Sequence, residues 1–310
     1  MTALDASPRP EQPHPGQPRS GQARAERAQP GGVAAVELRG ARMVLGERVL
    51  WDGLDLRVEA GEFIAVLGPN GSGKTTLLKV LLGQRELSAG TVRIGGRPPG
   101  GAGSGVGYIP QQQAMDVDVP LRARDLVGLG LDGHQLGLGL GSLFGSRLGS
   151  RSGGRAVARS RRAVVDAALA EVGATAYANS PVGRLSGGEQ QRLRVAQALV
   201  GDPSVLLCDE PLLSLDLANQ RVVSELIDAR RTEAATAVLF VTHEINPVLP
   251  LVDRVLYLVN GQFRVGTPDE VMTSEVLSEL YRTRVDVLRL RDRLVVVGAE
   301  DPGCHREHTA

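Results

Sequence analysis

The sequence is poor in aromatic and sulfur-containing side chains. Its 310 residues include one tryptophan, four tyrosines, four phenylalanines and two cysteines. Two cysteines do not make a disulfide framework, and such sparse use is typical of proteins in a reducing compartment. Cys208 lies inside an apolar run, and Cys304 lies close to the C-terminus. We therefore expect a cytosolic protein without disulfide bonds.

Net charge and long apolar runs are also missing. The 35 basic residues balance the 35 acidic residues, so the chain has no strong overall field for nucleic acid, and we expect no nucleic-acid partner. The stretch that comes nearest to a membrane span, residues 126–145, contains Asp132, His134, Gln135 and seven glycines. A spanning helix would not tolerate that mixture, so we predict no transmembrane segment.

The composition of the two ends predicts disordered tails. Residues 1–32 contain six prolines and lack the apolar centre of a secretory signal, and residues 299–310 are short and polar. Between them we predict one main domain over residues 33–270 and a C-terminal extension over residues 271–298. In the extension, Ser274 is predicted to cap a short helix that ends at Tyr281, and two strand-like runs follow it.

Three runs of consecutive apolar residues, 63–67, 205–208 and 238–241, indicate strands that are buried on both faces. Helical stretches precede the second and third runs, and this alternation predicts a parallel sheet. Residues 33–96 instead alternate between apolar and polar side chains, which predicts an N-terminal antiparallel β subdomain. Asn260 and Gly261 form a two-residue turn between further strand-like runs, as in a hairpin.

An inserted α-helical subdomain is predicted over about residues 112–185. It includes a helix from Arg162 to Val172, which Gly173 stops. A Gly/Arg-rich loop is predicted over about residues 133–160, where acidic residues are absent. We interpret this loop as a solvated linker, and contact with anionic lipid headgroups is the alternative. The fold class is therefore α/β.

A glycine-rich segment between the first apolar run and a helix has the context of a phosphate-binding loop, which predicts a phosphate-loop (P-loop) NTPase core. Its glycines let backbone N–H groups close around a phosphate, Lys74 neutralises the β- and γ-oxygens, and the Thr75 hydroxyl is a Mg²⁺ ligand. The predicted ATP-binding residues are Gly68, Pro69, Asn70, Gly71, Ser72, Gly73, Lys74, Thr75 and Thr76.

Two carboxylates follow the second apolar run. Asp209 closes the run, where a carboxylate is costly unless it meets a cation, and Mg²⁺ bound through water is that cation. Glu210 is predicted to face the γ-phosphate as a general base or as a group that orients water. By itself such a pair is usually a solvated turn, and the segment that precedes it along the chain makes the functional interpretation the stronger one.

That segment runs Leu185, Ser186, Gly187, Gly188, Glu189 and Gln190, and it resembles the signature motif of the ATP-binding cassette (ABC) ATPases. The serine hydroxyl, the amides beside the glycines and the positive end of a helix make a second phosphate cradle. The alternative is a glycine turn before an amphipathic helix. One copy cannot fold both cradles onto one nucleotide, so the resemblance implies a homodimer that encloses two ATP molecules, each in the signature of the opposite subunit.

The resemblance covers residues 34–270 and implies further roles. Gln111 corresponds to a glutamine that reaches Mg²⁺ and the attacking water, and His243 corresponds to the switch histidine that contacts the γ-phosphate. Ser214, Leu215 and Asp216 correspond to the D-loop, which touches the partner subunit. The implied catalytic residues are Lys74, Gln111, Glu210 and His243, and the implied Mg²⁺ ligands are Thr75, Gln111 and Asp209.

One position departs from the family pattern. Family members place an aromatic ring ahead of the strand that enters the phosphate loop, where it stacks on adenine, and this chain has Leu45 at the corresponding point. We therefore expect modest affinity for ATP, weaker by about tenfold or more, because stacking on a base contributes about 1–3 kcal/mol. Trp51 is near in sequence, and we expect it to pack in the core.

The resemblance implies an ATP-hydrolysing subunit of a transporter, which lies on the cytoplasmic face of the membrane. Import is favoured, because exporters of the family commonly fuse the cassette with membrane spans. The segment from Gln111 to Pro120, which includes Asp116 and Asp118, and the segment from Ser274 to Val297 are similar to zinc and manganese importers. The implied partners are integral-membrane permease subunits and an extracytoplasmic substrate-binding protein. The alternatives are a split exporter and a soluble regulatory ATPase.

Overall fold

The computed structural model describes residues 32–100, 105–111, 120–132 and 151–298. The two predicted tails, apart from Gly32, and both Asp116 and Asp118 lie outside these residues. Within the described ranges, no helix combines the length and the apolar character that crossing a membrane requires.

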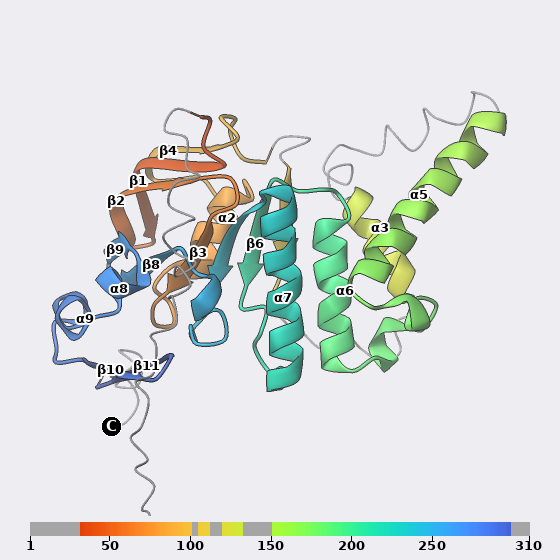
Figure 1. Cartoon of the computed structure of the whole chain (residues 1–310). Coiled ribbons are helices and arrows are strands. Elements are labelled where there is room, and N and C mark those ends of the chain that lie inside the picture. The colour runs from red at the N-terminus through yellow and green to blue at the C-terminus, as the bar shows by residue number, and fades with distance from the viewer. Residues whose placement is uncertain (1–31, 101–104, 112–119, 133–150, 299–310) are drawn as a thin grey trace, which may run out of the picture. The chain divides into compact units, whose positions relative to one another are not determined.

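A six-stranded sheet forms the centre of the fold (Figure 1). Its strands, in spatial order, are β5 (Val106–Ile109), β6 (Val205–Asp209), β7 (Ala237–Val241), β3 (Phe63–Leu67), β8 (Arg254–Val259) and β9 (Gln262–Gly266). Neighbouring strands from β5 to β8 run parallel, and β9 returns antiparallel to β8 through the predicted turn at Asn260 and Gly261. All residues of β3, β6 and β7 are buried, which confirms the sequence-based prediction for these three runs.

A second, antiparallel sheet covers one face of the central sheet. It consists of β2 (Arg48–Val58), β1 (Val36–Leu45) and β4 (Ala89–Ile94) in that order. The alternating pattern predicted an antiparallel sheet in this part of the chain. Helix α2 (Lys74–Leu81) shares a hydrophobic core with this sheet and with the even-numbered residues of β3, Ile64 and Val66. Trp51 is fully buried in the same core, in agreement with the packing role expected for it.

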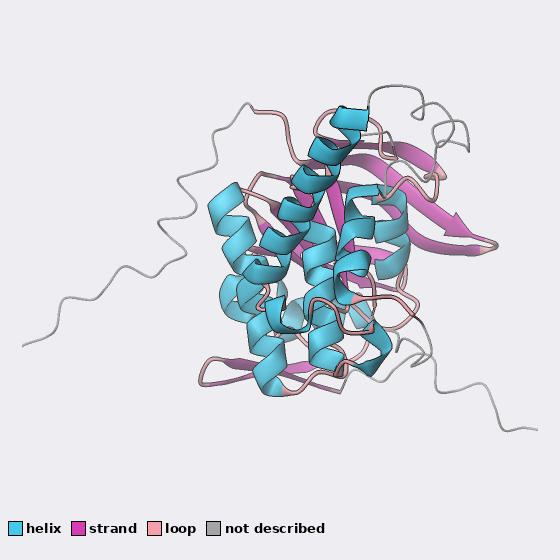
Figure 2. Cartoon of the chain, turned by 90° about the vertical axis from the view of Figure 1, so that its right-hand side faces the viewer, coloured by secondary structure: helices cyan, strands magenta, loops and turns pink. Residues whose placement is uncertain are grey.

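A layer of helices lies on the opposite side of the central sheet (Figure 2). It consists of α3 (Ala123–Asp132), α5 (Arg151–Glu171), α6 (Gly187–Leu199) and α7 (Leu217–Ala234), with short 3-10 turns at Thr175–Tyr177, Val182–Arg184 and Leu249–Leu251. Helix α6 packs against β5, and α3 and α5 pack on α6. Phe63 of β3 and Phe240 of β7 point to this side and stack with ring centroids 5.4 Å apart. Strand residues of opposite parity therefore serve the two cores, as the pleat of a strand requires.

Helix α5 begins earlier than the sequence predicts. It starts at Arg151 and not at Arg162, so residues 151–160, which we expected in the Gly/Arg-rich loop, are helical. Arginine and alanine both have high helix propensity, and they outnumber the two glycines of this stretch. The remaining residues of the predicted loop, 133–150, lie outside the described part of the chain.

Helices α3 and α6 approach closely at Gly130. A Cβ atom on Gly130 would lie 2.1 Å from the backbone oxygen of Gln197, whereas one on Gly128 would meet only ordinary contacts at 3.5 Å and beyond. Only a glycine fits at residue 130 with the backbones this close. The contact holds the helical layer directly to the helix that begins at the serine-glycine motif.

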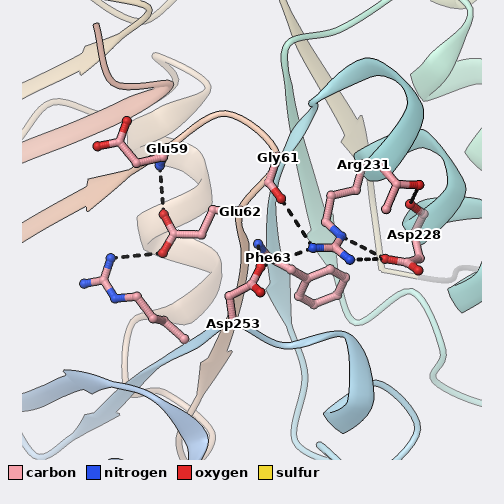
Figure 3. A network of polar contacts seen from close by, with 9 residues as sticks. Glu59, Gly61, Glu62, Phe63, Asp228, Arg231 and Asp253 are labelled. Carbon is pink, nitrogen blue, oxygen red and sulfur yellow. Dashed lines mark hydrogen bonds and ion pairs between the residues drawn. The ribbon is translucent and has the colours of Figure 1, made fainter. Parts of the chain in front are cut away.

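A buried arginine joins helix α7 to the central sheet (Figure 3). The side chain of Arg231 is 2% exposed, and its guanidinium donates to Asp228, to the backbone oxygen of Gly61 and to Asp253 at 3.2 Å. The same Asp253 oxygen accepts the backbone N–H of Phe63 at 2.8 Å. The cluster therefore fixes the helix to the first residue of β3 and to the residue that precedes β8.

Helix α8 (Pro268–Val271) spans the predicted boundary between the main domain and the C-terminal extension. The extension then consists of α9 (Ser274–Tyr281) and a hairpin of β10 (Asp286–Leu290) and β11 (Arg293–Val297). The predicted cap of α9 was wrong by one residue, because the Thr273 hydroxyl accepts the backbone N–H of Val276. The Ser274 hydroxyl instead accepts the N–H of Val287 at 2.8 Å and so ties the helix to the hairpin. Leu277, Leu280 and Leu294 bury the extension against strands β3 and β8.

Candidate nucleotide-binding site

The carboxyl ends of the parallel strands meet at one edge of the sheet, and a cavity of about 1070 Å³ opens there. This is the usual place for a ligand in an open parallel sheet. The predicted site residues that line the cavity are Gly68, Pro69, Asn70, Gly71, Gly73, Lys74, Thr75, Thr76, Gln111, Glu210 and His243. Ser72 is buried within the same loop.

The glycine-rich loop is tightly wound around Lys74. The Lys74 ammonium donates to the backbone oxygens of Gly68 at 2.6 Å and Pro69 at 3.0 Å, and the residue is 6% exposed. Gly68 has a φ of 137°, and a Cβ there would lie 2.0 Å from the backbone oxygen of Leu258. The loop therefore holds a cation beside the N-terminus of α2, and both features attract phosphate.

Thr75 and Asp209 form an oxygen-rich pair behind this loop. The Thr75 hydroxyl donates to Asp209 Oδ1 at 3.1 Å, and the Tyr108 hydroxyl donates to Oδ2 at 3.4 Å. Burial raises the pKa of the Asp209 carboxyl above its ordinary value, and the hydrogen bond from Thr75 lowers it. A hydroxyl beside a carboxylate that burial destabilises is a donor set that suits a hard divalent cation, so the pair fits Mg²⁺.

Glu210 brings together two other predicted residues. Its Oε2 atom lies 3.5 Å from Gln111 Nε2 and 3.5 Å from His243 Nδ1, and its side chain is 14% exposed. The backbone of Glu210 has a φ of 48°, an uncommon conformation for a residue with a side chain. A carboxylate oriented by an amide and an imidazole at a phosphate site can orient and deprotonate water.

The serine-glycine motif lies apart from this cavity. Ser186 caps α6 in a reciprocal capping box with Glu189, and the hydrogen bond from the Ser186 backbone lowers the pKa of the Glu189 carboxyl. None of the residues from Leu185 to Gln190, all within the described ranges, lines the cavity. The chain thus has two separated helix starts that suit an anion.

The motif instead approaches the first turn of α7, which follows the predicted D-loop. Asp216 caps α7 by accepting the backbone N–H of Asn219 at 2.8 Å, and a Cβ on Gly188 would lie 2.3 Å from the Asn219 side-chain oxygen. Ser214 precedes the cap with a φ of 62° and Leu215 is buried. A side chain at residue 188 would therefore collide with Asn219, so the close approach of the first turns of α6 and α7 requires glycine there.

Leu45, Arg48 and Leu50 line the cavity on the side of the antiparallel sheet. Leu45 and Arg48 face each other across the hairpin between β1 and β2, and a Cβ on Gly71 would lie 3.3 Å from the Arg48 guanidinium. The sequence analysis singled out Leu45 and missed Arg48. The signal for Arg48 was its cross-strand position, which appears once the hairpin register is known.

The sequence analysis also missed the contribution of the C-terminal extension. Tyr281, Leu294, Val295 and Val296 line the same cavity as the glycine-rich loop. They belong to no motif, and only the tertiary fold brings them to the site. The cavity therefore has one polar wall from the strand ends and one apolar wall from the extension.

Known proteins with similar sequences are named as ATP-binding proteins of transport or import systems. The ABC transporter family model matches residues 51–213. The zinc transport system ATP-binding protein TroB of Treponema pallidum is 35% identical over 237 residues, 76% of this chain and 82% of that protein. The aliphatic sulfonates import ATP-binding protein SsuB 1 of Nocardia farcinica is 35% identical over 75% of this chain and 81% of its own length. The manganese transport system ATP-binding protein MntB of Bacillus subtilis is 30% identical over 86% and 99%.

A solved structure agrees with these matches. The dimeric post-hydrolysis state of an ATP-binding cassette bound to ADP and Pi superimposes with a TM-score of 0.59 and 27% identity, and the match covers 75% of this chain and 98% of that one. The chain therefore belongs to the ABC transporter family, and it is an ATP-binding cassette ATPase.

Proposed function

We propose that two copies of this ATPase close on two ATP molecules and power the import of a divalent metal cation, zinc or manganese. The observation that carries the dimer is the separation of the two anion sites, because Lys74 lines the cavity and Ser186 does not. A second copy that places its Ser186 over the first copy's cavity would complete each site. The solved relative whose name describes a dimer supports this arrangement.

The residues at the strand ends have different roles in ATP hydrolysis. The glycine-rich loop and Lys74 bind the phosphates, and Glu210 accepts a proton from the attacking water. Gln111 and His243 orient the Glu210 carboxylate from two sides, 3.5 Å from each. Mg²⁺ held by Thr75 and Asp209, with Gln111 close by, would neutralise phosphate charge when bound.

Metal import is supported by the names of two relatives, a zinc and a manganese transport protein, although a sulfonate importer is equally similar. The match with the manganese relative extends over 86% of this chain. The chain would work at the cytoplasmic face of the membrane with integral-membrane permease subunits and an extracytoplasmic substrate-binding protein. The cargo would pass through the permease, because the cavity described above is shaped by phosphate-binding elements.

The test of the dimer uses the variant Glu210→Gln with ATP and magnesium. Blocked hydrolysis should accumulate a dimer in size-exclusion chromatography with light scattering. The control Lys74→Ala combined with Glu210→Gln should remain a monomer, because the phosphates are no longer bound. A Glu210→Gln protein that stays monomeric at saturating ATP would contradict the proposed sandwich.

The test of the cargo uses the chain reconstituted in vesicles with its membrane permease subunits. Zinc or manganese with the cognate binding protein should raise ATP hydrolysis and accumulate inside the vesicles. An alkanesulfonate should do neither. Stimulation by the sulfonate alone would replace the metal assignment and leave the ATPase assignment intact.

A further inference from the structure

The loop that carries His243 is internally tied by its own side chains. We call residues 242–246, from Thr242 to Asn246, the switch loop. The Thr242 hydroxyl donates to the backbone oxygen of Glu244 at 2.9 Å and accepts its N–H at 3.1 Å. The Glu244 carboxylate accepts the backbone N–H of Asn246 at 3.2 Å and its side-chain amide at 2.6 Å. His243 therefore lies between two fixed points.

Asn246 also fastens this loop to the C-terminal hairpin. Its Nδ2 donates to the backbone oxygen of Leu294 at 2.9 Å, and its Oδ1 accepts the backbone N–H of Leu294 at 2.8 Å. The opposite orientation of the amide would bring donor to donor and acceptor to acceptor, so the two bonds define the orientation together. These two hydrogen bonds resemble those between paired β-strands, with the Asn246 side chain in place of one strand.

The hairpin is a firm support for the switch loop. Leu294 is 4% exposed and packs into the core of the extension. On the other side of the hairpin, the Ser274 hydroxyl accepts the N–H of Val287, and the Ser278 hydroxyl bonds both backbone groups of Val285, at 3.0 and 3.1 Å. Displacement of β11 would therefore have to disturb helix α9 as well.

The contacts form a continuous route to the reacting edge of the site. The route leads from Leu294 through Asn246 and Glu244 to His243, whose Nδ1 lies 3.5 Å from Glu210. His243 has a half-exposed side chain, so the orientation of the ring depends on the loop that carries it. A loop released at Asn246 would lose its fixed end three residues from the imidazole.

We propose that Asn246 is a positioning residue for ATP hydrolysis, which holds the switch loop on the C-terminal hairpin so that His243 meets Glu210. This inference rests on the proposed function, because it takes His243 and Glu210 as hydrolytic residues. It gives the extension a part in turnover. Asn246 lines the cavity, but its side-chain amide is bound to Glu244 and Leu294, so the inference places no group of Asn246 on the nucleotide. Binding of ATP therefore should not need Asn246, whereas hydrolysis should.

The test compares Asn246→Ala with Thr273→Ala in the full chain. Asn246→Ala should lower kcat at least tenfold and change the KM for ATP less than twofold. Thr273→Ala removes the cap of α9 and loosens the same extension without touching the switch loop, so kcat should stay within twofold of the native value. Both variants are assayed well below their melting temperatures, with circular dichroism as a check of folding.

Two outcomes would overturn the positioning role. A kcat for Asn246→Ala within twofold of the native value is one, and an equal loss of kcat in Thr273→Ala is the other, since a general loosening would then explain both. The double variant Asn246→Ala, Glu210→Gln distinguishes failure of the positioning role from failure of the proposed function. This double variant should still form the ATP-dependent dimer. Absence of that dimer in Glu210→Gln alone would instead remove the sandwich on which the inference rests.

Discussion

The hydroxyl of Thr75, at the start of helix α2, donates a hydrogen bond to the carboxylate of Asp209, at the end of strand β6, over 3.1 Å. The two residues are 134 positions apart in the sequence. The bond joins the loop that wraps phosphate to the strand end that bears the acidic pair. It also places two oxygen atoms side by side at the position where a cation would meet the phosphates.

Substitution of this hydroxyl should impair the magnesium-dependent hydrolysis of ATP. Thr75→Val keeps the shape of the side chain and deletes the oxygen, so we expect ATP hydrolysis at saturating magnesium to fall by about 100-fold. The measurement is a magnesium titration of the steady-state rate. Thr232→Val, on the exposed side of helix α7, is the matched control and should leave the titration unchanged. An unaltered magnesium curve for Thr75→Val would refute the assignment.

Leu45→Tyr should tighten ATP binding. The leucine lines the cavity beside the glycine-rich loop, and an aromatic ring in its place would stack on adenine and lower the dissociation constant about tenfold. Isothermal titration with ATP and with inorganic tripolyphosphate separates the base from the phosphates. Only the ATP constant should change, and equal constants for the native protein and Leu45→Tyr would dismiss the adenine role of this position.

Arg231→Met should destabilise the fold by about 3 kcal/mol. Methionine fills much of the space of the buried side chain, but Asp228 and Asp253 lose their cationic partner. Urea denaturation gives the free energy of unfolding. Arg221→Met on the same helix removes an exposed pair with Glu225, and its midpoint should stay where it is. Similar midpoints for the two variants would mean that burial of Arg231 adds nothing.

Two alanine substitutions in helix α3 should have opposite signs. Gly130→Ala forces a methyl group against the backbone of Gln197 and should cost about 1–3 kcal/mol. Gly128→Ala meets only ordinary contacts and should gain about 0.5–1 kcal/mol from helix propensity. Thermal unfolding of both variants gives the signs. A stabilised Gly130→Ala would show that α3 and α6 separate easily.

Local patterns predicted the central sheet and the loops on it. The buried runs at 63–67, 205–208 and 238–241 are β3, β6 and β7, because a strand covered on both faces needs no alternation. Motifs anchored to strand ends also placed Lys74, Gln111, Glu210 and His243 around one cavity. Parallel strands bring their carboxyl ends to one edge, and the resemblance to the family pointed to Gln111 and His243 among the residues there.

Contacts made by packing between distant segments could not be predicted in the same way. Arg48 reaches the glycine-rich loop through the register of a hairpin, and Leu294 reaches Asn246 across 48 positions through the fold of the extension. The start of α5 was missed because a glycine pair hid the helix propensity of the arginines and alanines around it. Thr273 and Ser274 are both favourable N-cap residues, and the point at which the chain turns into α9 decides which of them is the cap.

The position of β3 between β7 and β8 has a consequence for how the molecule opens. Amide hydrogens on a fully buried central strand exchange with solvent only when the whole domain unfolds. The glycine-rich loop therefore follows directly after the strand that we expect to unfold last. The hairpin at residues 286–297 has several side chains in water, and it can open together with helix α9 while the central sheet stays folded. Phosphate binding and the positioning of His243 therefore depend on segments of unequal local stability. A substitution in one segment can change its stability without loosening the other.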